Sequence, residues 1–98
     1  MNPTDQTYHS LLTHLAQLTD PEQIDTVLSA LLTDKERQDI ANRIRIFDLL
    51  EQGTTQRQVS QALGVGIATV SRGAKAIQNT DNLEAIHDLL ATHRQSTY

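Results

Sequence analysis

Three basic side chains, Arg57, Arg72 and Lys75, lie in a stretch from residue 53 to residue 80 that contains no aspartate or glutamate. The rest of the chain is acidic, with nine acidic against four basic residues in 1–52 and three against one in 79–98, so the net charge is −4. A basic island on an acidic protein is a place where a polyanion can dock, while the acidic remainder disfavours indiscriminate binding to nucleic acid. The charge pattern therefore indicates one local anion-binding surface.

The residues near these charges carry small or hydrogen-bonding side chains. Ala68, Thr69, Ser71 and Arg72 surround Val70 in the sequence, and they face outward if Val70 packs inward on a helix. Hydroxyl and guanidinium groups on an outward helical face can form hydrogen bonds to base edges in a DNA major groove. The chemistry expected from this stretch is recognition of duplex DNA.

Other kinds of chemistry find little support in the residue types. There is no cysteine, which excludes disulfides and thiolate zinc sites, and the histidine pairs 9/14 and 87/93 are spaced wrongly for two metal ligands on one helical face. No acid and histidine have a spacing suited to a catalytic site, and the glycines of 64–66 do not form a phosphate loop of Walker or Rossmann form. We therefore predict no metal site and no enzyme, with the four histidines on the solvated surface.

Length and hydropathy set further limits. No apolar run approaches the roughly 18 residues that a membrane span requires, and residues 1–10 lack the basic region and apolar core of a signal peptide. We expect a cytoplasmic protein with no membrane contact. A chain of 98 residues with one phenylalanine, two tyrosines and no tryptophan forms a single domain, 1–98, and it buries only a modest fraction of its surface alone. Oligomerisation is therefore expected.

Two short helices joined by a tight turn are predicted to position the outward side chains. Val59 and Leu63 form an apolar pair one helical turn apart, and Gly64 can adopt the left-handed conformation that a turn requires. Val70 supplies a matching apolar contact on the second helix. The pattern predicts a helix-turn-helix over about residues 55–77.

The start of the first short helix is marked by Thr55 and Gln58, which form a capping-box pattern. An ordinary αα-hairpin inside a helical bundle is the alternative, because it also needs a glycine turn and paired apolar positions. The second helix offers little that is bulky to a core beyond Ile67, Val70 and Ile77, which counts against this alternative.

Two amphipathic helices are predicted before this region. Residues 6–18 place apolar side chains on one helical face, and Asp20 with Pro21 begins a second helix that runs to Leu31. Their apolar faces would be covered by a core or a dimer interface, or else would bind partner helices.

The longest predicted helix begins at the capping-box pair Thr33 and Glu36 and ends at Gly53. Its apolar residues cover more than one face, which is typical of a central helix that packs against two sets of helices. One chain supplies only one set, so we expect the second set from another subunit in an intertwined homodimer. Arg43 and Arg45 lie on this helix, where they could be solvated charges that pair with neighbouring aspartates.

A last helix is predicted to begin at the capping pair Asp81 and Glu84, and the polar tail 93–98 is expected to fray. The resulting fold is all-α, with about six helices, a central long helix and a helix-turn-helix.

The segments LLTDKERQDIANRIRIFDLLEQG and TQRQVSQALGVGIATVSRGAKAI resemble the tryptophan repressor family. The resemblance covers roughly Leu28 to Ile77. Its most specific part is GIATVSRG, because generic helix-turn-helix proteins usually carry an apolar residue where Gly73 stands. The resemblance implies an all-α intertwined dimer that binds a palindromic operator in double-stranded DNA when loaded with L-tryptophan.

The same resemblance implies a binding site for L-tryptophan. Arg43 and Arg72 match two arginines that sandwich the indole ring, and Arg72 also meets the carboxylate. A planar guanidinium can both stack on an aromatic face and hold a carboxylate by paired hydrogen bonds. Gly73 would leave room for the ring, and the carbonyls of Ala30 and Leu32 would accept from the ammonium group. The implied ligand-binding residues are Ala30, Leu32, Thr33, Arg43, Thr69, Arg72, Gly73 and Ala76.

Two residues depart from the family pattern, and between Gly53 and Gln56 the chain has one residue fewer than that pattern. Ala76 stands where the family has a serine near the ligand's amino group, and Ser60 stands where it has a lysine near a phosphate. The residues expected at DNA are Gln56, Arg57, Ser60, Ile67, Ala68, Thr69, Ser71, Arg72 and Lys75.

We therefore predict a ligand-gated transcriptional repressor with L-tryptophan as corepressor. One alternative is a related DNA-binding regulator with a different effector or none, which would give no heat on titration with tryptophan. Another is a helical protein-interaction module, which would show no salt-dependent binding to duplex DNA.

Overall fold

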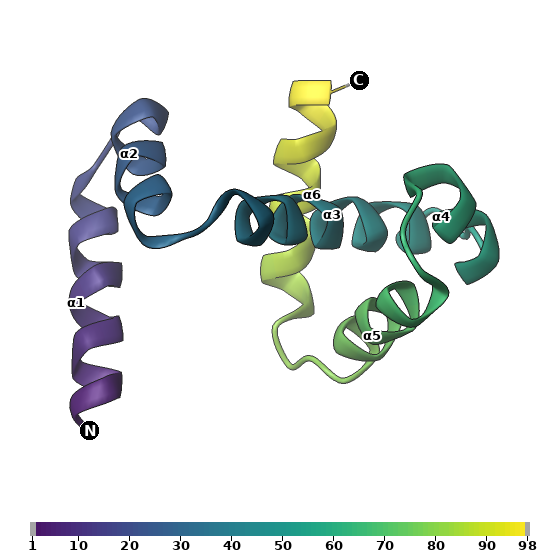
Figure 1. The fold of residues 1–98 in the computed structure, drawn as a ribbon, viewed down its shortest axis with the longest axis horizontal. Helices are drawn as coiled ribbons and strands as arrows, with labels where there is room; N and C mark the ends of the chain where they lie inside the picture. Colours follow the sequence, from purple (N-terminus) through teal and green to yellow (C-terminus); the bar gives the residue numbers. More distant parts are fainter. Residues whose placement is uncertain (1, 98) are drawn as a thin grey trace. The chain divides into compact units, whose positions relative to one another are not determined.

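The computed structural model describes residues 2–97, which contain helices and connecting turns only (Figure 1). The described chain groups into two compact units, one up to Arg37 and one from Gln38 on, and the boundary falls inside α3. The predicted all-α fold with a long helix and a helix-turn-helix is confirmed. The six helices are α1 (Pro3–Gln17), α2 (Pro21–Leu31), α3 (Asp34–Glu51), α4 (Gln56–Leu63), α5 (Ile67–Gln78) and α6 (Leu83–Thr97).

The first unit contains α1 and α2, each opened by a local cap. The Asn2 side chain accepts from the Asp5 N–H at 2.8 Å and Pro3 follows it, so α1 begins earlier than the apolar periodicity indicated. Asp20 accepts from the Glu22 N–H at 3.0 Å, as the Asp-Pro pair predicted. Neither α1 nor α2 contains a fully buried residue, and their apolar faces are only partly covered, with Leu11, Leu15, Ile24 and Leu28 half-buried.

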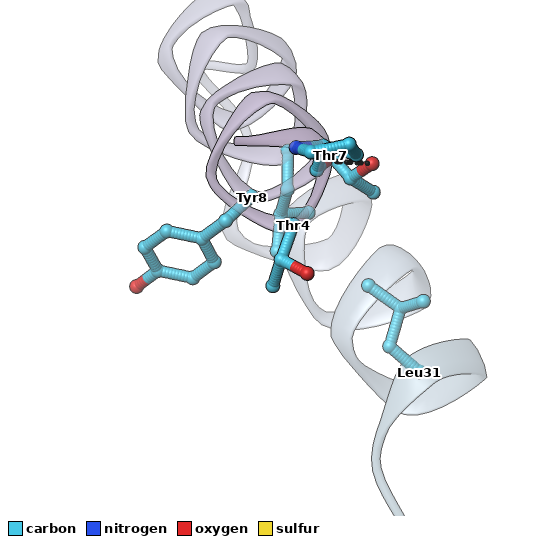
Figure 2. Close-up of a pocket in the computed structure, with 6 residues that line it drawn as sticks. Thr4, Thr7, Tyr8 and Leu31 are labelled. Carbon is cyan, nitrogen blue, oxygen red and sulfur yellow. Dashed lines mark hydrogen bonds between the residues drawn. The ribbon is translucent and has the colours of Figure 1, made fainter. Parts of the chain in front are cut away.

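An open groove of 530 Å³ runs between α1 and α2 (Figure 2). The Tyr8 and Leu31 side chains at its rim are 61% and 60% exposed. The Thr7 hydroxyl donates to the Pro3 carbonyl at 3.0 Å, so it is satisfied within α1. The remaining surface of the groove is mainly apolar. Its lining residues are Pro3, Thr4, Thr7, Tyr8, Leu11 and Leu31.

The ends of α3 are both defined by side-chain and backbone caps. The Glu36 carboxylate accepts from the Thr33 N–H at 2.9 Å and the Thr33 hydroxyl accepts from the Glu36 N–H at 3.1 Å, which is the predicted capping box. At the other end Gly53 has φ +89°, and the N–H groups of Gly53 and Thr54 donate to the carbonyls of Leu50 and Leu49. These two bonds form a Schellman motif, and Gly53 ends the helix as predicted.

The core of the second unit is formed where α3 meets the helix-turn-helix. Ile46, Val59 and Val70, from α3, α4 and α5, are almost completely buried and form one cluster. Ile40, nearer the start of α3, is 50% exposed. The predicted two-sided helix is thus covered by its own unit around Ile46 and left open around Ile40. The cluster is surrounded by partly buried Leu49, Leu50, Leu63 and Val65.

A buried carboxylate connects α6 to α3. Asp48 of α3 is 1% exposed, and the Arg94 guanidinium of α6 donates from Nε to its Oδ1 at 2.6 Å. His93 Nε2 lies 3.8 Å from the other carboxylate oxygen, and His87 Nε2 lies 3.0 Å from Oε2 of Glu51. These contacts agree with the crossing of α6 over α3 in Figure 1.

Three predictions about this last helix are corrected by the structure. The tail expected to fray after residue 92 is helical as far as Thr97, because Arg94 is anchored on Asp48 of α3; Tyr98 lies outside the described residues. The helix begins at Leu83, where the Asn82 carbonyl accepts from Ile86, and not at an Asp81 cap. His93 is only 23% exposed and is not a solvated surface residue.

Within residues 2–97, none of the helices is both long enough and apolar enough to cross a membrane. Over the same residues, the structure brings no three or more histidine, aspartate or glutamate side chains together in a way that would hold a metal ion.

Candidate functional site

The two helices predicted to contact DNA are joined as a helix-turn-helix. The Thr55 hydroxyl accepts from the Gln58 N–H at 3.2 Å, and the Gln58 side chain accepts from the Thr55 N–H at 3.1 Å. Gly64 has φ +67°, and its N–H donates to the Ser60 carbonyl at 3.0 Å. A residue with a Cβ is disfavoured in this left-handed conformation, so Gly64 allows the chain to turn directly from α4 toward α5.

Ser60 stabilises this turn from the inside. Its hydroxyl is half-buried and donates to the Val65 carbonyl at 2.6 Å. The family resemblance placed Ser60 among the residues near DNA, but it did not indicate this hydrogen bond. This hydrogen bond links α4 to the turn that precedes α5.

The outer face of α5 carries the side chains expected to meet DNA. Val70 is completely buried, whereas Ile67 is 51% exposed and therefore belongs to the outer face and not to the core. Arg57 at the start of α4 is also exposed. The stretch 53–80 has no acidic residue, so this face combines apolar, hydroxyl and positively charged groups. The other exposed residues of α5 from the predicted DNA set are Ala68, Thr69, Arg72 and Lys75.

Gln56 and Ser71 are brought together across the two helices. The Ser71 hydroxyl on α5 donates to Oε1 of Gln56 on α4 at 2.7 Å. Gln56 is exposed and Ser71 is half-buried, so the bond lies at the edge of the outer face. Both residues were predicted to approach DNA, but their separation of 15 positions in the sequence gave no sign that they contact one another.

Gly73 is the point where α5 packs against α3. It is buried, and a Cβ built on it would lie 2.8 Å from Cγ2 of Ile46 and 3.9 Å from Cε1 of Phe47. A contact of 2.8 Å is shorter than a packed core allows. The glycine that the family resemblance assigns to the ligand's ring thus also permits close helix packing.

The residues expected at a tryptophan ligand occur in both units. In the first, Ala30 and Leu32 lie at the C-terminal end of α2, where the last carbonyls of a helix have no partner within it. Thr33 follows as the cap of α3. In the second unit, Arg43 on α3 is exposed. The residues on α5 are Thr69 and Arg72, which are exposed, Gly73, which is buried, and Ala76, which is half-buried.

Comparison with known proteins gives the same assignment along almost the whole chain. Residues 6–93 match the family model for the Trp repressor protein. A Trp operon repressor homolog from Vibrio cholerae is 36% identical over 91 residues, which cover 90% of this chain and 88% of that protein. A Trp operon repressor homolog from Vibrio atlanticus is 34% identical over 91 residues, covering 90% of this chain and 93% of that protein.

A shorter match joins this chain to a Trp operon repressor homolog from Vibrio parahaemolyticus, which is 39% identical over 66 residues, covering 66% of this chain and 64% of that protein. No solved structure matches the chain. The family match includes all of α2 to α5, and so the whole helix-turn-helix, together with most of α1 and α6. The chain therefore belongs to the Trp repressor protein family, a family of transcriptional repressors and not of enzymes.

Proposed function

We propose that this protein is a ligand-gated DNA-binding repressor that binds a palindromic operator as a homodimer, with L-tryptophan as its corepressor. The observation that carries the proposal is the outer face of the helix-turn-helix. Ile67, Ala68 and Thr69 are exposed at the N-terminal end of α5, and the surrounding stretch is positively charged in an otherwise acidic protein. This is the end of a recognition helix that meets base edges in a major groove.

We expect some of these side chains to contact base edges and others to contact phosphates. Arg57 can form paired hydrogen bonds to a guanine, and the apolar groups of Ile67 and Ala68 suit a thymine methyl. Lys75 is farther along α5 and is suited to a phosphate, which strengthens binding without selecting a sequence. We place the protein in the cytoplasm, where such an operator would be met.

Tryptophan would act by fixing α5. Arg72 is next to Gly73, which packs against Ile46 of α3, and Arg43 lies on the same α3. A ligand held by both arginines would couple the position of the recognition helix to that of α3. If the ligand binds more tightly when α5 is placed for DNA, it shifts the protein toward that state.

The end of α2 is suited to the ligand's ammonium group. Ala30 and Leu32 present carbonyls at the C-terminal end of this helix, where the helix dipole is negative and a cation is stabilised. The preference of this helix end for an ammonium group and that of Arg72 for a carboxylate correspond to the two charged groups of an amino acid.

A homodimer is supported by the apolar surface that one chain leaves uncovered. Tyr8 and Leu12 on α1, Ile40 on α3 and Leu83 and Leu89 on α6 are all between 41% and 61% exposed. A second copy can cover such faces, and a two-fold dimer presents two recognition helices to the two halves of a palindrome.

The proposal is tested by titrating the protein with L-tryptophan and then selecting duplexes from a random DNA pool with and without the ligand. We expect one ligand site per subunit and tighter, salt-dependent binding to the selected duplex when tryptophan is present. L-Phenylalanine is the control, because it has the same charged groups and a smaller ring. Duplex binding that is indifferent to tryptophan would contradict the corepressor assignment, and the absence of duplex binding would contradict the repressor proposal.

A related regulator with a different effector or none is the second candidate, and one observation favours it. Ala76 is half-buried on α5 and has no polar side chain to offer an amino group. An effector without an amine would be less affected by this position. Titration with indole-3-propionate, which keeps the ring and carboxylate, distinguishes the two candidates if it binds more tightly than tryptophan.

A further inference from the structure

The hydrogen bond between Ser71 and Gln56 determines what each side chain can offer to a third partner. Ser71 Oγ donates to Gln56 Oε1 at 2.7 Å. A serine hydroxyl has one proton and two lone pairs, and a glutamine amide has an accepting oxygen and a donating NH₂ group. While the bond is present, Ser71 therefore offers only an acceptor, and Gln56 offers the two donors of its NH₂ group.

The positions of the two residues separate the groups that they would meet. Gln56 is the first residue of α4 and is exposed, and Ser71 lies on α5. In a helix-turn-helix the first helix crosses the DNA backbone and the second enters the major groove. The NH₂ group of Gln56 is thus suited to a phosphate oxygen, which only accepts, and the Ser71 hydroxyl to a base edge.

We propose, on the basis of the proposed DNA-binding function, that Ser71 and Gln56 act together to select a base that carries an exocyclic amino group. The Ser71 hydroxyl accepts from N6 of adenine or N4 of cytosine. Gln56 is a positioning residue, because its amide oxygen accepts the hydrogen bond from the Ser71 hydroxyl and so prevents Ser71 from donating to a base. Guanine O6 and N7 and thymine O4 are themselves acceptors. They cannot form a hydrogen bond with a Ser71 oxygen that only accepts, so guanine and thymine are disfavoured at this position.

The other glutamines of α4 cannot substitute for Gln56 in this arrangement. The oxygen of Gln58 is already used by the Thr55 N–H in the capping box. Gln61 is exposed in the last turn of α4, away from the helix start at which Gln56 meets Ser71. Gln61 therefore provides a matched control, since it is the same residue type on the same helix.

The test measures affinity for a family of duplexes in which each base of one selected half-site is changed in turn, with tryptophan present. For the parent protein we expect one position at which adenine or cytosine is favoured over guanine or thymine by about five- to tenfold. Ser71→Ala should remove this preference, and Ser71→Thr, which keeps the hydroxyl, should retain part of it. Gln61→Ala should bind all duplexes as the parent does.

The variants of Gln56 give the sharper result. Gln56→Ala leaves the Ser71 proton free to reach guanine O6 or thymine O4, so it should weaken the preference at the same position although residue 56 touches no base. Gln56→Glu keeps an oxygen that accepts from Ser71, so it should retain the preference while binding every duplex more weakly through repulsion from phosphate. Thermal melts of all variants check that they fold.

The outcomes separate this inference from the function on which it rests. If Gln56→Ala weakens all duplexes equally and leaves the base preference intact, Gln56 contacts only the backbone and the inference is wrong. It is also wrong if Ser71→Ala keeps the preference. If the parent protein selects no duplex at all, the proposed repressor function has failed as well.

Discussion

Gly73 and Ile46 approach one another so closely that a Cβ on Gly73 would lie 2.8 Å from Cγ2 of Ile46. Ile46 is 1% exposed and belongs to the central cluster with Val59 and Val70, so its side chain has little room to move. The recognition helix therefore rests on α3 at a point where only glycine fits. Arg72, the preceding residue, is exposed on the outer side of α5.

Gly73→Ala is expected to destabilise the protein. Alanine is favoured over glycine inside a helix by about 0.5–1 kcal/mol, but overpacking a core typically costs about 1–3 kcal/mol. We expect the overlap with Ile46 to outweigh the helical preference, with a net loss of about 1–2 kcal/mol in the free energy of unfolding. Urea denaturation measures this difference. Increased stability in the variant would show that the two helices are not in close contact.

Ile46→Leu provides the control, because leucine carries no methyl group on Cβ. The double variant should lose less stability than the sum of the two single changes, since the overlapping atom is gone. Additive losses would mean that Gly73 meets some other part of α3.

A second prediction concerns the pair formed by Asp48 and Arg94. Arg94→Met would leave the carboxylate buried without its 2.6 Å partner. Breaking a fully buried ion pair costs about 3–5 kcal/mol, and because the Arg94 side chain is 42% exposed we expect a smaller loss of about 1–3 kcal/mol. The free energy of unfolding in urea should fall accordingly. Asp48→Leu combined with Arg94→Met should recover much of that loss, because the buried carboxylate is removed together with Arg94.

The local signals in the sequence were sufficient to predict most of the helices. Asp20 with Pro21, Thr33 with Glu36 and Thr55 with Gln58 each act over a few residues, so the capping bonds follow directly from residue type and spacing. The start of α1 was missed because the apolar periodicity begins after Pro3, although the preceding Asn2 is itself a capping residue.

Contacts between distant residues were not predictable in the same way. Arg94 and Asp48 are 46 positions apart, and a tail rich in polar residues looks unstructured until its partner on α3 is known. The bond of Ser71 to Gln56 and the contact of Gly73 with Ile46 likewise depend on how the helices cross. Family resemblance assigned Gln56 and Ser71 to DNA and Gly73 to the ligand without indicating what they touch in this chain.

A third prediction is that the protein is an obligate dimer at working concentrations. The groove between α1 and α2, with Tyr8 and Leu31 at its rim, is open in the single chain, and exposed apolar surface of this kind favours association. Thermal stability should therefore rise with protein concentration, because folding is coupled to association. A folded monomer in sedimentation at micromolar concentration would contradict this expectation.

Arg57→Ala and Arg72→Ala should separate DNA binding from ligand binding. Arg57→Ala is expected to leave tryptophan affinity within about twofold of the parent and to weaken operator binding by about 1–3 kcal/mol if it reads a base edge. Arg72→Ala should lose the ligand, because the guanidinium that stacks on the ring and holds the carboxylate is removed. Calorimetric titration and operator binding give both values. Loss of tryptophan binding in Arg57→Ala with an intact DNA complex would show that the two roles are assigned to the wrong residues.

The last prediction concerns Ala76, which is half-buried on α5 and which the family resemblance matches to a serine near the ligand's amino group. With alanine, the carbonyls of Ala30 and Leu32 are the acceptors proposed for the ligand's ammonium group. A missing hydrogen bond costs about 0.5–1.5 kcal/mol unless water replaces it, so Ala76→Ser should bind tryptophan up to about tenfold more tightly. Calorimetric titration of both proteins measures the gain.

Indole-3-propionate identifies the source of that gain, because it keeps the ring and carboxylate of tryptophan and has no amine. If the new hydroxyl meets the ammonium group, the affinity for indole-3-propionate should change less than the affinity for tryptophan. Titrating both ligands against both proteins isolates this difference as a coupling free energy. An equal gain for the two ligands, or a loss for tryptophan, would place residue 76 away from the amino group and would require a different arrangement of the ligand between α3 and α5.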